Sequence, residues 1–412
     1  MILLSVIIAS GIVTSTVLFT VYFPSKREYK NHDPIIILND QDFENYRFSG
    51  SGDKNDPYII EGLYINADLD AIRIQWTSKF FEIRNCKLES NERAVHIDSA
   101  ASGAASIKDN IIDKGSISIL LSHNTTIENN LMREGGFYSI KIENSIQTLI
   151  RNNTILNKEI GIFLAVADYI TIEENFIYSE HIIEQNIGFF DYGNVGILSQ
   201  GAHNTINNNT ILNQDLGLYQ KGNCALISNN NISNCSYGIF GWYMNVSTIN
   251  NNRIFNNTEI GIHIQETNFA NVLHNHCEEN NISLQISASQ FNEISNNTFL
   301  SNFIGLEIKV TGLGTMSYRK TLNNTVRFNF FAINSFYGLK NGWLCEFSKI
   351  YLNSFFFNNQ AGTSQAYDEG DYSEWSNDNS EGNFWSEWLS GDYYIDGSSN
   401  STDQFPLDYP TV

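Results

Sequence analysis

One short phrase, isoleucine-x-x-asparagine-x-isoleucine, returns about every 22 residues along most of the sequence, and Ile206, Asn209 and Ile211 form one copy. The central position is asparagine in ten of twelve copies: Asn110, Asn130, Asn153, Asn175, Asn209, Asn230, Asn252, Asn297, Asn329 and Asn353. Cys86 and His276 occupy it in the other two. Repetition at a fixed period indicates a solenoid, whose repeats stack only on their neighbours.

Each copy follows a second phrase, a small residue and then apolar-x-apolar, as in Gly161, Ile162 and Leu164. This alternation is typical of a β-strand. It breaks at the asparagine phrase, where four residues lie between the two apolar markers, so we predict a corner there. Asparagine suits a corner because it tolerates the left-handed backbone conformation and its amide can bond free backbone groups. We therefore expect the ten asparagines to form a structural ladder.

These features predict an all-β fold, a single-stranded right-handed parallel β-helix (solenoid) of about 12 coils with ~22-residue repeats, preceded by one N-terminal hydrophobic helix. The expected regions are a transmembrane anchor or signal segment (1–25), a linker and N-terminal cap (26–50), the β-helix (51–360) and an acidic aromatic C-terminal cap (361–412).

The first 23 residues contain no charged side chain and are long enough to span a bilayer. No basic N-terminal region or small-residue cleavage site stands out, which favours an uncleaved membrane anchor over a signal peptide. Basic residues follow only on the C-terminal flank, at Lys26 and Arg27, and by themselves would place that side in the cytoplasm. We nevertheless expect an exported body on the extracellular or periplasm-like side.

The charge and cysteine content exclude several classes of protein. The chain has 24 Lys plus Arg against 45 Asp plus Glu, a net charge of −21, so we expect no nucleic-acid partner. Its five cysteines are odd in number and scattered, which favours neither a disulfide framework nor a zinc ribbon. We expect a monomer.

One copy of the phrase is irregular, because His276 stands in place of the ladder asparagine and Glu278 in place of the inward apolar residue. Imidazole, thiolate and carboxylate groups are metal ligands, so His274, His276, Cys277 and Glu278 form a candidate metal site. The alternative is one coil that has drifted without function. No motif requires a cofactor. Ca, Zn or Cu could bind, but the sequence has no specific motif for any of them. The candidate site for Ca is the group of acidic C-terminal turns.

Two coils are longer than the others, and loops on a rigid scaffold often carry binding sites. The first insertion, residues 178–193, contains Glu180, His181, Glu184 and Asp191. The second, residues 309–320, contains Arg319. We predict these residues as possible ligand-binding positions.

A possible apolar binding stripe consists of the residues that follow the inward apolar position: Leu156, Leu212, Phe255, Leu300 and Phe356. If they point outward, they favour a glycan or a cell-surface protein as partner. If the corner is wide, they point into the core instead.

Glycoside hydrolysis needs two neighbouring carboxylates. The outward positions beside the first apolar marker include Arg84, Lys108, Glu128, Arg151 and Glu173, with no two carboxylates adjacent. No polygalacturonase-like or pectate-lyase-like catalytic set is present either, so an enzyme is the less favoured alternative.

The opening segment Ser49-Gly-Ser-Gly-Asp-Lys-Asn-Asp-Pro-Tyr-Ile-Ile-Glu-Gly62, the repeat and the closing Gly382-Asn-Phe-Trp-Ser-Glu-Trp388 together resemble the NosD-type right-handed parallel β-helix family. The resemblance covers about residues 49–410 and places the chain in the wider carbohydrate-binding and sugar-hydrolase group of β-helix proteins. The family takes its name from a periplasmic protein that helps to mature a copper enzyme. With four methionines and eight dispersed histidines, the sequence has no copper motif.

We therefore expect an exported, membrane-anchored β-helix surface protein that acts as a scaffold or carbohydrate-binding module. The alternatives are a polysaccharide-active hydrolase or lyase and a metal-handling accessory protein of the NosD type.

Overall fold

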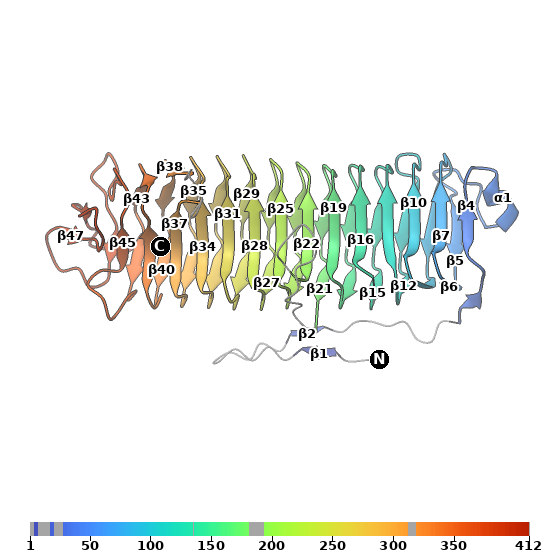
Figure 1. The fold of residues 1–412 in the computed structure, drawn as a ribbon, viewed down its shortest axis with the longest axis horizontal. Coiled ribbons are helices and arrows are strands. Elements are labelled where there is room, and N and C mark those ends of the chain that lie inside the picture. Colours follow the sequence, from blue (N-terminus) through green and yellow to red (C-terminus); the bar gives the residue numbers. More distant parts are fainter. Residues whose placement is uncertain are drawn as a thin grey trace.

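The computed structural model describes residues 4–6, 17–19, 28–134, 136–180, 193–311 and 319–411. It is a rod of stacked coils, in which each coil adds one strand to each of three parallel sheets (Figure 1). The described residues form a right-handed solenoid of about 13 turns, which confirms the β-helix predicted with about 12. The sheets contain 14, 13 and 15 strands, and we name them the long sheet, the second sheet and the third sheet.

The long sheet contains the longest strands, most of them six residues. In order along the rod they are β4 (Ile35–Ile37), β7 (Asp70–Gln75), β10 (Arg93–Asp98), β13 (Ser116–Leu120), β16 (Tyr138–Glu143), β19 (Ile160–Ala165), β22 (Val195–Gln200), β25 (Leu216–Lys221), β28 (Tyr237–Trp242), β31 (Ile260–Gln265), β34 (Ile282–Ser287), β37 (Ile304–Lys309), β41 (Tyr337–Asn341) and β45 (Ala366–Asp368).

The second sheet follows the first corner of each coil. Its strands are β5 (Tyr58–Glu61), β8 (Phe81–Arg84), β11 (Ala105–Lys108), β14 (Thr126–Glu128), β17 (Leu149–Arg151), β20 (Thr171–Glu173), β23 (Thr205–Asn207), β26 (Leu226–Ser228), β29 (Thr248–Asn250), β32 (Asn271–Leu273), β35 (Glu293–Ser295), β39 (Thr325–Arg327) and β43 (Lys349–Tyr351).

The third sheet follows the asparagine corner. Its strands are β3 (Lys30–Asn31), β6 (Leu63–Ala67), β9 (Lys87–Ser90), β12 (Ile111–Ile112), β15 (Leu131–Arg133), β18 (Thr154–Leu156), β21 (Phe176–Tyr178), β24 (Thr210–Leu212), β27 (Asn231–Ser233), β30 (Arg253–Phe255), β33 (His276–Glu278), β36 (Thr298–Leu300), β40 (Phe330–Ala332), β44 (Ser354–Phe356) and β46 (Phe384–Trp385).

The remaining elements are short. Helix α1 spans Asp42–Tyr46, β38 (Thr321–Leu322) pairs in parallel with β42 (Cys345–Glu346), and β47 (Tyr393–Tyr394) pairs antiparallel with β48 (Thr402–Asp403). These elements lie at the ends of the rod or beside its long coils.

The expected N-terminal hydrophobic helix is not seen. Within its span the structure describes only β1 (Leu4–Val6) and β2 (Val17–Phe19), paired antiparallel, and the other residues of 1–23 lie outside the described ranges. None of the described residues forms a helix long and apolar enough to cross a bilayer.

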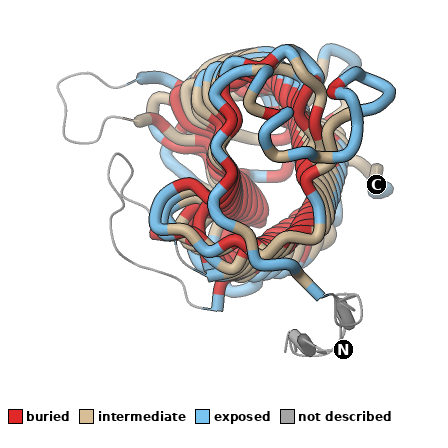
Figure 2. The backbone as a smooth tube through the Cα atoms, turned by 90° about the vertical axis from the view of Figure 1, so that its right-hand side faces the viewer, coloured by how far each residue is buried: buried red, intermediate tan, exposed pale blue. Residues whose placement is uncertain are grey.

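The core is a set of apolar columns inside the coil. Viewed along the rod, buried residues line its interior (Figure 2). The first apolar marker of each repeat pairs in register with that of the next, as Ile150 does with Ile172 and Ile172 with Ile206. All three are fully buried. Burying one such side chain contributes about 1.5–3 kcal/mol, so stacking of whole coils stabilises what a single repeat cannot.

The predicted asparagine ladder is confirmed. The Oδ1 atom of Asn130 accepts hydrogen bonds from the backbone N–H of Asn110 at 3.1 Å and from its side-chain amide at 3.0 Å. The same arrangement links each coil to the next through Asn110, Asn130, Asn153, Asn175, Asn209, Asn230, Asn252, Asn275, Asn297, Asn329, Asn353 and Asn383. The ladder ends on Asp403, which accepts from the backbone N–H of Asn383 at 2.7 Å.

From Asn110 to Asn353, the left-handed conformation belongs to the residue before each ladder asparagine rather than to the asparagine itself. Asp109 and Asn129, for example, have φ angles of 58° and 57°. The asparagine therefore serves the corner through its side-chain amide, which satisfies backbone groups of two coils.

A second ladder, which the sequence interpretation missed, lies at the corner after the third sheet. Its members are Asn257, Asn280, Asn302, Asn334 and Asn358, and Gln365 ends it. Asn257 comes three residues after the inward Ile254, so the same apolar-x-x-asparagine spacing marks both corners. Lys158 takes the corresponding position after Ile155 and donates to the carbonyl oxygens of Gly115 and Glu134.

Candidate functional site

The outer face of the long sheet carries side chains in columns, because alternate residues of a strand point away from the core. In β7, Ile72 and Ile74 are buried inside, so Arg73 and Gln75 face outward. Register pairing continues the Arg73 position through the later strands as the outer column: Arg73, His96, Ser118, Lys141, Phe163, Leu198, Tyr219, Phe240, His263, Gln285, Glu307 and Lys340. This column is polar at both ends of the rod and largely aromatic in its middle.

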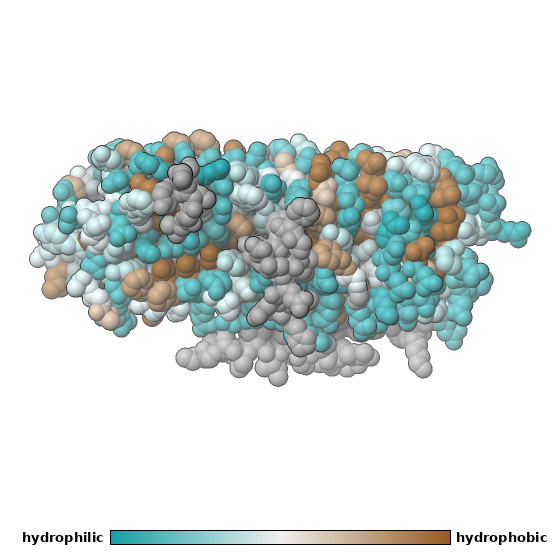
Figure 3. Space-filling view, viewed as in Figure 1, coloured by the Kyte–Doolittle hydropathy of each residue, from teal (hydrophilic) through white to brown (hydrophobic). Residues whose placement is uncertain are grey.

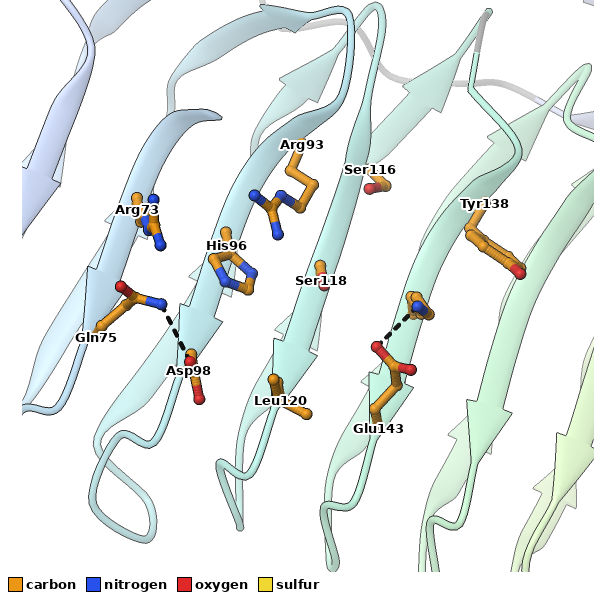
Figure 4. Close-up of a pocket in the computed structure, with 11 residues that line it drawn as sticks. Arg73, Gln75, Arg93, His96, Asp98, Ser116, Ser118, Leu120, Tyr138 and Glu143 are labelled. Atoms are coloured by element: carbon orange, nitrogen blue, oxygen red, sulfur yellow. Dashed lines mark hydrogen bonds and ion pairs between the residues drawn. The ribbon is translucent and has the colours of Figure 1, made fainter. Parts of the chain in front are cut away.

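An open pocket of about 440 Å³ lies at the N-terminal end of this face, across β7, β10, β13 and β16 (Figure 4). Arg73, Arg93 and Lys141 bring three cationic groups to its lining, and Asp98 and Glu143 bring two carboxylates. The lining has one more cation than carboxylate, and Asp70, which contacts Arg93 and lies near Arg73, balances that charge.

Most charged side chains of the pocket form ion pairs or hydrogen bonds with neighbouring residues. Arg93 donates to both carboxylate oxygens of Asp70, at 2.6 and 3.1 Å. Lys141 lies 2.8 Å from Glu143, and Gln75 donates to Asp98 at 3.1 Å. These contacts fix the walls of the pocket without closing it.

Two buried nitrogen atoms in the pocket have no hydrogen-bond partner among the described residues, Nε of Arg73 and Nδ1 of His96. The Nε atom of Arg73 lies 3.8 Å from the nearest Asp70 oxygen, too far for a hydrogen bond. His96 is only 5 % exposed, and Figure 4 shows its ring in the centre of the pocket. An unsatisfied buried polar atom costs about 1–3 kcal/mol, so both atoms mark a place where a bound group would be stabilised.

Burial, followed by the positive charge of Arg93, lowers the pKa of His96 below its usual value of 6.5. The ring is therefore neutral near pH 7, with one nitrogen as donor and the other as acceptor. It can hydrogen-bond a ligand without bringing a further positive charge into a pocket that already holds three.

An aromatic row continues the outer face beyond the pocket. Tyr138, which lines the pocket, stacks on Phe163 with ring centroids 5.0 Å apart. Further along, Phe240 stacks on His263 at 4.8 Å, and the ammonium of Lys221 lies 4.8 Å from the ring centre of Trp242. Tyr138, Phe163, Phe240 and Trp242 belong to a hydrophobic cluster separate from the core. Its buried members are Ile160, Val195, Leu198, Leu216 and Tyr219. Figure 3 shows apolar side chains gathered on this face.

The structure corrects the register of the irregular copy at residues 272–279. Val272 pairs with Ile249, Cys277 pairs with Ile254, and Asn275 is the ladder residue. His276 therefore does not replace the ladder asparagine, and Glu278 does not replace the inward apolar residue. The sequence is ambiguous here because Val272 and Leu273 are both apolar, and only the contacts with the adjacent coils distinguish them.

This register separates the four predicted metal-ligating residues. Cys277 is buried in the core, whereas His274 lies exposed at the corner. His276 and Glu278 point outward, and the Nε2 atom of His276 lies 3.4 Å from the nearest carboxylate oxygen of Glu278. Within the described ranges, no three His, Cys, Asp or Glu side chains are close enough to share a metal ion.

The predicted loop residues do not form one site. Glu180 follows β21, where its backbone N–H donates to Asn157 at 2.8 Å. Arg319 contacts Glu266 and the Tyr243 hydroxyl at the first corner, next to the long sheet. His181, Glu184 and Asp191 lie outside the described residues.

The predicted apolar stripe does point outward, on the third sheet. The neighbouring inward positions, such as Ile155, Ile211 and Ile254, are buried in the core. Leu156, Phe255, Leu300 and Phe356 are half-buried, and Leu212 is 3 % exposed. Arg253 lies over the ring of Phe255, 4.6 Å from its centre.

One carboxylate of the acidic C-terminal turns is held by several protein donors. Asp368 is fully buried and accepts hydrogen bonds from the side chains of Asn341, Trp375 and Ser401. Trp385 stacks between Phe355 and Tyr393, at 4.3 and 3.9 Å, and covers the last apolar column. Both features serve packing at this end of the rod.

The sequence interpretation missed the pocket and the aromatic row. It examined the outward column of the second sheet, where Arg151 lies between Glu128 and Glu173 and pairs with Glu128 at 2.7 Å. The sequence did carry a signal for this face. At the position equivalent to Arg73 in each repeat, the residue changes from charged to aromatic and back along the chain.

Residues 36–214 match the family model described as periplasmic copper-binding protein (NosD), and residues 178–331 match that of the right handed beta helix region. No curated protein matches the chain. The predicted resemblance to NosD-type β-helices is confirmed.

Several solved structures are similar in fold. The A-module of the mannuronan C-5 epimerase AlgE6 from Azotobacter vinelandii has 14% identity and a TM-score of 0.46, over 82% of this chain and 98% of that chain. The periplasmic alginate epimerase AlgG has 11% identity and a TM-score of 0.48, over 84% and 85%. The catalytic domain of a GH87 alpha-1,3-glucanase in complex with nigerose has 13% identity and a TM-score of 0.43, over 88% and 68%. At these values the likeness is one of fold alone.

The name of the matched family raises the question of copper. Histidine, cysteine and methionine are the usual copper ligands. Met132 and Met244 are fully buried in the core, and the described residues contain no cluster of three His, Cys, Asp or Glu side chains. The described part of this chain therefore does not fit a copper centre.

Proposed function

We propose that this right-handed parallel β-helix, whose residues 36–214 match the NosD family, is a carbohydrate-binding protein that holds an extended glycan along the outer face of its long sheet. The observation that carries the proposal is the meeting of the aromatic row and the polar pocket at Tyr138. From β7 to β31 this face is about 38 Å long at a strand spacing of about 4.8 Å.

Sugars present apolar ring faces and a rim of hydroxyl groups, so a glycan site needs aromatic surface together with hydrogen-bonding groups. Phe163, Phe240 and Trp242 supply half-buried aromatic surface. Arg73 and His96 supply nitrogen atoms without partners among the described residues. Both requirements are met on a single face. Phe163 and Phe240 share the outer column with Arg73 and His96, whereas Trp242 lies in the adjacent column. Leu198 and Tyr219, between Phe163 and Phe240, are buried.

The apolar stripe on the third sheet is a weaker candidate for the same role. Its residues point outward, but Leu156, Leu212 and Leu300 offer no aromatic ring. Only Phe255 and Phe356 do, and the Phe255 ring is already covered on one side by Arg253. The stripe therefore provides the matched control face.

We further propose that the body is exported and held at the membrane by residues 1–23. The description of the matched family as periplasmic supports export, and the apolar composition of these residues supports attachment. Separating membrane and soluble fractions of cells that produce the full chain, with and without residues 1–23, tests the attachment. The full chain in the soluble fraction would contradict it.

A glycan array probed with the full chain tests binding. We expect a selective signal for a small group of polysaccharides, and a loss of that signal on changing Phe163→Ala or Trp242→Ala. Phe255→Ala is the matched control, because it removes a half-buried aromatic ring from a different sheet.

Each outcome has a distinct meaning. Loss of signal with F163A and W242A but not with F255A supports the long sheet. Loss with F255A alone moves the site to the third sheet. A uniformly blank array contradicts glycan binding and favours a scaffold without a carbohydrate ligand.

A further inference from the structure

We infer that the pocket on β7, β10, β13 and β16 is a subsite for the carboxylate of an acidic sugar, so that the glycan bound by this protein is a polyuronate. This inference rests on the proposed function and names its substrate class. It concerns a single charged group of the ligand at one end of the face.

The pocket gathers three cationic side chains on an acidic chain. The whole chain carries −21, yet three cations and two carboxylates line this pocket. At physiological salt, charges more than about 8 Å away are largely screened, so the nearby groups decide which ligand is bound. Asp70 contacts Arg93 and lies 3.8 Å from Arg73, so the preference for a negatively charged group rests on the Arg73 guanidinium and not on a net positive field.

The cations of the pocket are not equivalent. Arg93 donates to both oxygens of Asp70, and Lys141 lies 2.8 Å from Glu143. Arg73 instead makes no hydrogen bond to any described residue through its buried Nε, and its nearest carboxylate oxygen is 3.8 Å away. Arg73 is therefore the cation that is left to bind a ligand.

His96 supplies the second contact. It follows Arg73 in the outer column on the adjacent strand, and its Nδ1 atom is buried without a partner in the described part of the chain. A carboxylate has two oxygens and can accept from the guanidinium and from a ring N–H at once. A neutral hydroxyl group can satisfy one of these atoms, but it binds a guanidinium less strongly than a carboxylate does, and Asp70 at 3.8 Å makes no hydrogen bond to Nε of Arg73.

The neighbouring aromatic row favours the carboxylate of a sugar over a small free anion as the ligand. Tyr138 lines the pocket and stacks on Phe163. A uronate residue in the pocket would continue into a chain whose next rings lie along this row. A small carboxylate alone would make only the polar contacts.

Isothermal titration of the full chain, kept in a mild detergent at physiological salt, tests the inference with three probes. These are a hexamer of galacturonic acid, the same hexamer as its methyl ester, and a neutral glucan hexamer. We expect the acid to bind at least about tenfold more tightly than the ester or the glucan, a difference of about 1.4 kcal/mol.

Substitutions test whether Arg73 contacts the carboxylate of the ligand. We expect Arg73→Gln to weaken binding of the acid by about tenfold and to leave the weak binding of the ester unchanged. Arg73→Lys keeps the charge but lacks Nε, and should lie between Arg73→Gln and the unaltered chain. Lys340→Gln is the matched control, because Lys340 occupies the same outer column beyond the aromatic row and pairs with Glu307 at 2.9 Å. It should change binding less than twofold.

The outcomes separate the inference from the proposed function. If the ester or glucan binds as tightly as the acid and Arg73→Gln has no effect, the inference is overturned while glycan binding stands. If a sulfated hexasaccharide binds more tightly than the uronate, the carboxylate assignment is overturned. If no probe binds here and the glycan array is blank, both fail.

Discussion

The Oδ1 atom of Asn275 accepts two hydrogen bonds from Asn252, one from its backbone N–H at 3.0 Å and one from its side-chain amide at 2.9 Å. Asn275 in turn donates to Asn297 at 3.0 Å and to the carbonyl oxygen of Ile249 at 2.9 Å. This pair fixes the register of the coil at residues 272–279. It also makes Asn275, rather than His276, the residue on which that corner depends.

Replacing Asn275 by alanine should lower the free energy of unfolding by roughly 2–4 kcal/mol. The change removes the side-chain partner of the buried backbone N–H of Asn252 and of the carbonyl oxygen of Ile249, and each unsatisfied group costs about 1–3 kcal/mol. Urea denaturation followed by circular dichroism measures the effect.

The adjacent His274 provides the control for this prediction. It is exposed and left-handed, with φ of 54°, and asparagine tolerates that conformation. His274→Asn should change stability by less than about 0.5 kcal/mol. A larger loss with His274→Asn than with Asn275→Ala would contradict the register.

The coil could be predicted from the sequence because its corners repeat a spacing. Ile150, Ile172 and Ile206 recur at one position, and stacking requires that this position be apolar in every coil. Where two apolar residues adjoin, as Val272 and Leu273 do, spacing alone gives two registers. The contact that decides between them lies in another coil, about one period away in the sequence.

The candidate site could not be predicted in the same way, because no local motif contains it. Arg73, His96 and Lys141 come from different repeats and meet only when β7, β10 and β16 stack. The outward positions are free to vary, so no repeated residue marks them. Their chemistry becomes visible only once the register places them in one column.

One thiol of five should react rapidly with a thiol reagent in the native chain at pH 8. Cys224 is exposed, whereas burial raises the pKa of Cys86 to about 11 and of Cys235 and Cys345 to about 12. Burial also raises the pKa of Cys277. Thiolates are the reactive form, so the four buried groups should react only after unfolding.

Titration with a colorimetric disulfide reagent counts these thiols before and after denaturation in guanidinium. Cys224→Ser should remove the fast phase and leave four thiols in the unfolded chain. A second fast thiol in that variant would show that one of the core cysteines is accessible.

Replacing Lys158 by methionine should flatten the dependence of stability on pH between about 8 and 10.5. Burial lowers the pKa of Lys158 from 10.5 to about 8. As the pH falls through this window, the unfolded chain binds the proton first, so the native state loses stability relative to the unfolded state. Below about pH 8 both states are protonated and the loss is complete.

The measurement is urea denaturation of both proteins at several pH values. The difference in unfolding free energy between the unaltered chain and K158M should shift by roughly 2 kcal/mol in favour of K158M as the pH falls from 10.5 to 8. The size of this difference at any one pH also includes the hydrogen bonds to Gly115 and Glu134 that K158M loses. The change of the difference with pH is therefore the informative quantity. Parallel pH profiles would show that Lys158 keeps an ordinary pKa.

Replacing Val246 by asparagine should stabilise the chain by about 1 kcal/mol. The exposed corner beside the long sheet holds bulky residues in the left-handed conformation: Tyr169, Val246, Phe269, Phe291, Phe347 and Tyr372. For a β-branched residue this conformation is strained, at a cost of about 1–2 kcal/mol, and asparagine adopts it more readily. Val246 has φ of 58° and is 62 % exposed, so the change removes little packing.

Ile146, which is also exposed at this corner but is not left-handed, provides the matched control, since Ile146→Asn relieves no strain. We expect the urea midpoint to rise with V246N and not with I146N. An equal rise in both variants would show that the gain comes from replacing an exposed apolar side chain by a polar one, and not from relief of backbone strain.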